Sequence, residues 1–130
     1  MKRMQLACLL TAALATAAPA MVAAAVTDFV FEAQPGHVPA SRDAVIGVRL
    51  LNKASGKPVA DAVIFQSRLD MSPDAMADMV SPLTPLPAEQ PGVYRFKADL
   101  SMAGRWALKL AAKVPGEQET VRGEVIVVAK

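Results

Sequence analysis

Apolar and polar residues alternate along most of the chain from residue 26 onward, and this period of two predicts β-strands. The pattern is strongest in residues 92–110, where Tyr94 and Phe96, and later Trp106 and Leu108, alternate with charged or small residues. We predict that these two stretches form a hairpin that turns at residues 101–104. Because an apolar sheet face needs a second layer to cover it, the hairpin indicates a two-layer fold.

Four further strands are predicted at residues 26–33, 43–51, 59–69 and 120–128, separated by turn signals. The residues expected to share a buried face on the last three are Ala44, Ile46, Val48 and Leu50; Val63, Phe65, Ser67 and Leu69; and Val121, Val125 and Val127. Residues 34–39 and 52–58 are predicted to be loops. Gly47 lies inside a strand pattern, which indicates either a bulge or the close approach of another backbone.

The alternation is lost in residues 70–90, which contain four prolines, three aspartates and three methionines. Ser72, Pro73 and Asp74 form a helix-start pattern, so a short helix is predicted over residues 73–79 with Ser72 as its N-cap. Pro82, Pro85 and Pro87 forbid its continuation and favour an extended, polyproline-like run.

Short strands at regular spacing with little helix predict an all-β fold, an immunoglobulin-like two-sheet antiparallel sandwich of about seven strands. Tyr94 and Trp106, the single tyrosine and the single tryptophan of the chain, are the expected aromatic anchors of its core.

The N-terminus predicts export. Lys2 and Arg3 precede an uncharged apolar stretch that ends in small residues, which is the pattern of a signal peptide. We expect residues 1–25 to be a signal helix cleaved after Ala25, with Ala20 as the alternative position, and residues 26–130 to be one periplasmic domain. A retained membrane anchor is the other interpretation. Cys8, the only cysteine, lies inside the signal, so the mature domain has no disulfide or thiolate chemistry.

Charge and composition argue against two classes of function. Without Lys2 and Arg3, 12 basic residues balance 12 acidic ones, so a nucleic-acid partner is not expected. With no cysteine and a single histidine in the mature domain, there is no Ser-His-Asp set and no His-based metal site, so the domain is not expected to be an enzyme.

Methionines are the candidate metal ligands. Met71, Met76 and Met79 fall within the irregular segment, and Met102 lies in the predicted hairpin turn. Thioethers are soft, neutral ligands that select Cu(I), but methionine also fills irregular gaps in cores and forms adaptable protein contacts. His37 is either an added nitrogen ligand or an exposed loop residue.

Three aspartates recur every four residues, at Asp70, Asp74 and Asp78. On the predicted helix they would share one face. The simpler interpretation is that this face is exposed to solvent. The alternative is a site for a hard cation, although a calcium-binding loop requires closer oxygen spacing and a glycine at its bend.

Several blocks together resemble the YtkA-like domain, also grouped with FixH-like proteins: residues 56–62 (GKPVADA), 91–94 (PGVY) and 101–106 (SMAGRW), with a methionine-containing segment between the first two. This resemblance implies an exported immunoglobulin-like sandwich associated with copper or heavy-metal handling. In such proteins the middle loop often carries a Met-Pro-x-Met type run, whereas here the methionines are spread over residues 71–79 and mixed with acids. The cleavable N-terminus favours the soluble YtkA-like side over the anchored FixH-like one.

Two functions follow as hypotheses. The first is a periplasmic, non-enzymatic domain that assists copper or heavy-metal handling beside an envelope transport complex and binds Cu(I) through Met71, Met76, Met79 and Met102. The second is an accessory subunit whose segment 70–90 docks on a partner in the envelope without a metal.

Overall fold

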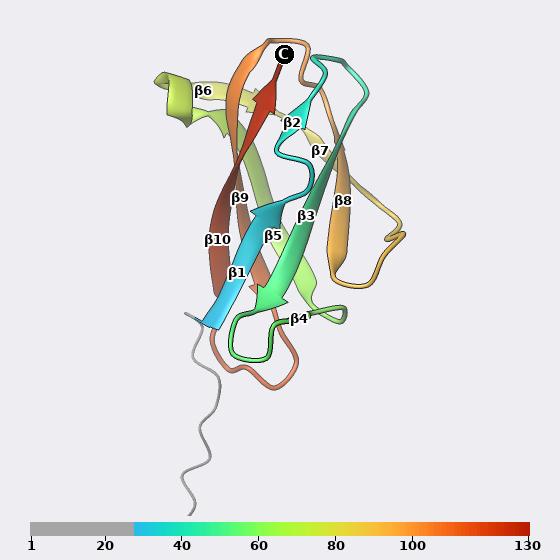
Figure 1. Cartoon of the computed structure of the whole chain (residues 1–130). Coiled ribbons are helices and arrows are strands. Elements are labelled where there is room, and N and C mark those ends of the chain that lie inside the picture. The colour runs from blue at the N-terminus through green and yellow to red at the C-terminus, as the bar shows by residue number, and fades with distance from the viewer. Residues whose placement is uncertain (1–27) are drawn as a thin grey trace, which may run out of the picture.

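The computed structural model describes residues 28–130, which form two packed β-sheets (Figure 1). The elements in chain order are β1 (Phe29–Ala33), β2 (His37–Val38), β3 (Ala44–Asn52), β4 (Lys57–Pro58), β5 (Val63–Met71), the 3₁₀ helix η2 (Ser72–Asp74), β6 (Met76–Ser81), β7 (Leu83–Leu86), β8 (Val93–Ala98), β9 (Gly104–Lys113) and β10 (Val121–Ala129). The first sheet has the order β1-β3-β8-β7, with β4 paired to β3, and the second has the order β2-β10-β9-β5-β6.

This strand order is that of an immunoglobulin-like sandwich. β1, β3, β8 and β7 occupy the A, B, E and D places of one sheet, while β10, β9, β5 and β6 occupy the G, F, C and C′ places of the other. All strand pairs are antiparallel except that between β2 and β10, which is parallel. The predicted all-β, immunoglobulin-like two-sheet sandwich is therefore confirmed for the described residues, which form ten strands where about seven were predicted. The predicted signal helix, its cleavage site and the retained anchor concern residues outside that range.

The core lies between the sheets, and the predicted inward faces of β3 and β10 are confirmed. Ala44, Ile46, Val48 and Leu50 are buried, as are Val121, Val125 and Val127. Trp106 is buried with 3% of its surface exposed, as expected of a core anchor. Tyr94 is only half-buried. Its hydroxyl group donates a hydrogen bond to the Val59 carbonyl at 2.7 Å and accepts one from the Ala62 N–H at 3.1 Å, so it holds the segment before β5 in position.

The predicted hairpin of residues 92–110 is wrong. β8 belongs to the first sheet and β9 to the second, so residues 99–103 cross between the sheets instead of closing a turn within one (Figure 1). Leu100, fully buried in this crossing, exchanges two backbone hydrogen bonds with Ser41, of 2.8 and 3.2 Å. The two apolar stripes face each other across the core. Alternation identifies an inward face, but it does not identify the neighbouring strand.

The face predicted for residues 63–69 is also wrong in part. Leu69 is buried, but Val63 is 63% exposed and Phe65 is 46% exposed. The register between β5 and β9 shifts between Ile64 and Gln66, so Phe65 has no partner on β9. This bulge turns Ile64 toward the core and Phe65 toward solvent.

The helix predicted over residues 73–79 does not form. Ser72 lies within η2 and is not an N-cap. η2 ends at Asp74, and its C-cap residue Ala75 has a left-handed φ of 60°. The chain reverses there and continues as β6, antiparallel to β5. The proline-rich run that follows includes β7, in which Pro85 opposes Phe96. β7 is an edge strand of the first sheet, a position where a residue without an N–H is tolerated.

The predicted loop at residues 34–39 contains a short strand, because β2 pairs with the end of β10. The close approach predicted at Gly47 is confirmed. Its carbonyl accepts a 2.8 Å hydrogen bond from the Gln34 N–H, and a Cβ at this position would overlap the Gln34 carbonyl oxygen. Only glycine allows the chain after β1 to lie this close to β3.

Candidate functional site

The methionine segment folds over the same end of the sandwich as the crossing 99–103 (Figure 1). Asp74 of η2 connects the methionine segment to the start of β9, which follows the crossing. Its carboxylate accepts hydrogen bonds from the Arg105 backbone N–H at 2.8 Å and from the Arg105 guanidinium at 2.7 Å. A further 2.7 Å bond runs from the Arg105 guanidinium to the Pro73 carbonyl. The hydrogen bonds from Arg105 hold the pKa of Asp74 below its ordinary value. These contacts fix the tip of the β5–β6 hairpin against the start of β9.

Met71 is part of the core. Its side chain is fully buried and lies so close to Gly104 that a Cβ there would overlap the Met71 terminal methyl group and the Asp74 carboxylate. Gly104 also has a φ of 144°. Because Met71 has no exposed surface, we interpret it as a core residue that fills space at the end of the sandwich.

Met79 and Met102 line one hollow of about 170 Å³, and of the methionines within residues 28–130, Met71 and Met76 do not line it. The two side chains are 39% and 43% exposed, and Trp106 forms part of the wall. The Trp106 indole N–H donates to the Met102 carbonyl at 3.1 Å, which fixes the backbone of the crossing over the ring. Met76 is 41% exposed, and its Cα lies opposite that of Met71. The hollow is therefore lined by one methionine of strand β6 and one of the crossing between the sheets.

Asp99 and Ser81 complete the polar side of this hollow. The Asp99 backbone N–H donates to the Ser81 hydroxyl at 3.1 Å, and the Asp99 carboxylate accepts from the Ser101 N–H at 3.0 Å. Hydrogen bonding from Ser101 lowers the pKa of Asp99, so the carboxylate is ionised at neutral pH. A negative charge at the rim of two neutral thioethers favours a cation.

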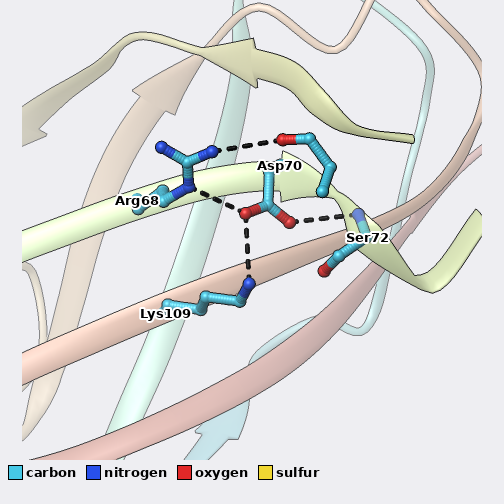
Figure 2. Close-up of polar contacts among 5 residues, drawn as sticks. Arg68, Asp70, Ser72 and Lys109 are labelled. Carbon is cyan, nitrogen blue, oxygen red and sulfur yellow. Dashed lines mark hydrogen bonds and ion pairs between the residues drawn. The ribbon is translucent and has the colours of Figure 1, made fainter. Parts of the chain in front are cut away.

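Asp70 is buried at the base of the same hairpin (Figure 2). Its carboxylate accepts hydrogen bonds from the Ser72 N–H at 3.0 Å, from Arg68 Nε at 2.9 Å and from Lys109 Nζ at 3.2 Å. Arg68 also donates to the Ala77 carbonyl of β6 at 3.1 Å. Burial alone would raise the pKa of Asp70, but these hydrogen bonds outweigh it and hold the pKa far below its ordinary value. The network joins β5, β6 and β9.

The three aspartates do not share a face, because the helix that would align them is absent. Asp70 is buried on β5, Asp74 pairs with Arg105, and Asp78 is exposed on β6. Across residues 28–130, no group of three or more His, Cys, Asp or Glu side chains could hold a metal ion.

His37 lies exposed on β2 at the same end of the sandwich as the hollow. Its Cα is opposite Val128 of β10, and Val128 is in turn opposite Arg105 of β9. His37 is therefore two strand spacings, about 10 Å, from the start of β9. It does not line the hollow of Met79 and Met102.

Comparison with known protein families identifies the family of this chain. The model of the YtkA-like family matches residues 22–111. The chain belongs to the YtkA-like family. The resemblance seen in the sequence is thereby confirmed at the level of the family. No curated protein matches this YtkA-like chain.

Solved structures similar to this YtkA-like chain include three, each at low identity. The Lin-41 filamin domain is 18% identical, with 79% of this chain and 92% of that chain covered and a TM-score of 0.44. The adhesin InvE of Yersinia pseudotuberculosis is 14% identical, with 81% and 27% covered and a TM-score of 0.42. The ZirS C-terminal domain is 13% identical, with 82% and 68% covered and a TM-score of 0.42.

Sequence reasoning found Met79 and Met102 but missed the residues that complete their hollow. Trp106 was expected only as a core anchor, and Ser81 and Asp99 carried no signal. Lys109 also carried no signal in the sequence, although it donates a hydrogen bond to the buried Asp70 carboxylate. The sequence did offer one signal for the network around Asp70. Arg68 and Asp70 are two residues apart, so they lie on the same side of a strand and can form an ion pair.

Proposed function

We propose that this YtkA-like domain is an exported, non-enzymatic protein that assists copper handling in the cell envelope and binds Cu(I) through the thioethers of Met79 and Met102. The observation that carries the proposal is that these two residues, distant in sequence, line one hollow with an ionised carboxylate at its rim. Thioethers bind soft monovalent copper without losing a proton, and the Asp99 charge offsets that of the ion.

The proposal narrows the ligand set expected from the sequence. Met71 is fully buried, so a metal ion would reach its sulfur only after the end of the core had opened. Met76 is accessible but does not line the hollow. Two thioethers and a rim carboxylate provide a weak site, which suits a protein that passes copper to a transport complex.

The test is a Cu(I) titration of the mature domain against a chromophoric chelator, under anaerobic conditions. The single tryptophan is a built-in second readout, since Trp106 lines the hollow and its fluorescence should be quenched as the ion binds. We expect the double variant Met79→Leu/Met102→Leu to bind at least about tenfold more weakly, which corresponds to about 1.4 kcal/mol. Met76→Leu is the matched control, because it removes an exposed thioether of the same strand from outside the hollow.

Equal affinity of the wild-type domain and the double variant would contradict the copper proposal. So would quenching of Trp106 that persists unchanged in the double variant.

A second candidate function, a metal-free accessory subunit, is favoured by strand β6. β6 is the edge of the second sheet, and Met76, Met79 and Val80 are exposed along it. An edge strand with exposed apolar side chains can pair with a strand of another protein. Metal-independent co-purification with an envelope complex, lost when residues 76–80 are replaced by serine and threonine with a proline at residue 78, would support this function. Retention of the complex by that variant would exclude β6 as the docking strand.

A further inference from the structure

An open groove of about 560 Å³ lies on the outer face of the second sheet, away from the methionine hollow. Its floor includes Ala111, whose neighbours across the sheet are Gln66 on β5 and Arg122 on β10. One row along the strands, Arg68 and Lys109 face each other. The small Ala111 side chain on β9 thus lies between two long polar side chains. Because alanine is much shorter than its neighbours, a groove forms above it on the face of the sheet.

The groove has an excess of positive charge. Arg68 and Lys109 share the single charge of Asp70, which leaves one of their two charges uncompensated. Arg122 forms no ion pair with any of residues 28–130, and its side-chain contact is a 3.5 Å hydrogen bond to Gln66. Glu124 of β10 lies opposite Lys109 and likewise forms no ion pair within that range. The groove itself is lined by three cations, Arg68, Lys109 and Arg122, and Lys113 lies beside it, whereas the acids next to these residues are Asp70 and Glu124.

Apolar side chains border the cationic centre. The bulge in β5 turns Phe65 outward into the groove, where the Lys113 ammonium group lies 5.9 Å from the centre of the ring. Val63, at the same end of β5, is 63% exposed. On the far side, Ile126 of β10 is 42% exposed. Exposed apolar groups on both sides of a charged centre form a surface suited to an amphipathic ligand.

We propose that this groove binds an extended, acidic peptide segment of a partner protein, with carboxylates at Arg122, Arg68 and Lys109 and an apolar side chain against Phe65. The guanidinium forks match carboxylates in geometry and charge. Sites for small molecules enclose most of the ligand, whereas this groove is open along the sheet and fits a chain laid across it. The proposal is independent of copper, because the groove contains no methionine.

The test measures fluorescence anisotropy of a fluorescein-labelled peptide that alternates glutamate and valine, titrated with the mature domain. We expect binding that weakens as salt rises, and about tenfold weaker binding by Arg122→Gln. Phe65→Ala is a second variant that removes no charge and should also weaken binding. Arg42→Gln is the control, because it loses the same charge from an exposed turn outside the groove and should bind like the wild type.

Three results would overturn the proposal. The first is equal weakening by Arg122→Gln and Arg42→Gln, which would mean unspecific attraction. The second is displacement of the peptide by free glutamate or inorganic phosphate at the same concentration, which would identify a small-anion site. The third is binding to phosphatidylglycerol vesicles with the same dependence on Arg122 while the peptide does not bind, which would identify a membrane surface.

Discussion

Replacement of Trp106 by alanine is expected to lower the free energy of unfolding by about 3–5 kcal/mol, the usual effect of removing a large buried aromatic side chain. The indole is 3% exposed, sits between the two sheets, and anchors the crossing 99–103 through its hydrogen bond to the Met102 carbonyl. Truncation would therefore leave a cavity in the core and free the backbone of that crossing. Urea unfolding followed by far-ultraviolet circular dichroism measures the change without the lost tryptophan signal.

Phe65→Ala is the matched control for this experiment. It also truncates an aromatic side chain on the second sheet, but Phe65 is 46% exposed, so we expect a loss of less than about 1 kcal/mol. A loss below about 1 kcal/mol for Trp106→Ala would show that Trp106 does not support the core.

Replacement of Asp70 by asparagine is expected to lower the free energy of unfolding by about 2–3 kcal/mol at pH 7, the range for hydrogen bonds to a charged group. Asparagine keeps an acceptor for the Ser72 N–H but loses the charge that attracts Arg68 and Lys109. Both cations are half-exposed, so solvent screens part of the effect. Asp78→Asn, an exposed carboxylate on β6, should change stability by less than about 0.5 kcal/mol.

The effect of Asp70→Asn should depend on pH in a definite direction. The pKa of Asp70 is lowered in the folded domain, so the ionised carboxylate contributes its full stabilisation above the ordinary aspartate pKa of about 4. That contribution is lost as the pH falls from about 4 toward the folded-state pKa. The stabilities of wild type and variant should therefore converge between about pH 4 and pH 2. A constant difference across that range would show that the charge of Asp70 does not stabilise the fold.

The inward faces of β3 and β10 could be predicted because the pleat of a strand is a local property. Pairing is not local. β8 and β9 carry equally good apolar stripes, and the alternation is the same whether they pair in one sheet or face each other across the core. The bulge after Ile64 also escapes a simple pattern, since one extra residue exchanges the faces of β5.

The residues of the candidate site could also be predicted only in part, because contacts between distant segments are not visible in the local pattern. The sequence groups Met71, Met76 and Met79, yet the fold buries the first, leaves the second outside the hollow and joins the third to Met102. Ser72, Pro73 and Asp74 have the composition of a helix start, but Ala75 in the left-handed region turns the chain back along β5. Pairing with a strand already present outweighed the weak local preference for a helix.

The crossing of residues 99–103 has a consequence for how this domain folds. β8 and β9 follow each other in sequence but lie in different sheets, so each has one partner that is a chain neighbour (β7 for β8, β10 for β9) and one partner that is distant in sequence. The distant pairings, of β8 with β3 and of β9 with β5, each close a long loop at a cost in chain entropy. Sandwiches with such distant pairings fold on the order of milliseconds to seconds. Hairpins such as β9–β10 can form early, but the domain is expected to fold more slowly than one built of hairpins alone, because each sheet is completed only when a strand distant in sequence pairs.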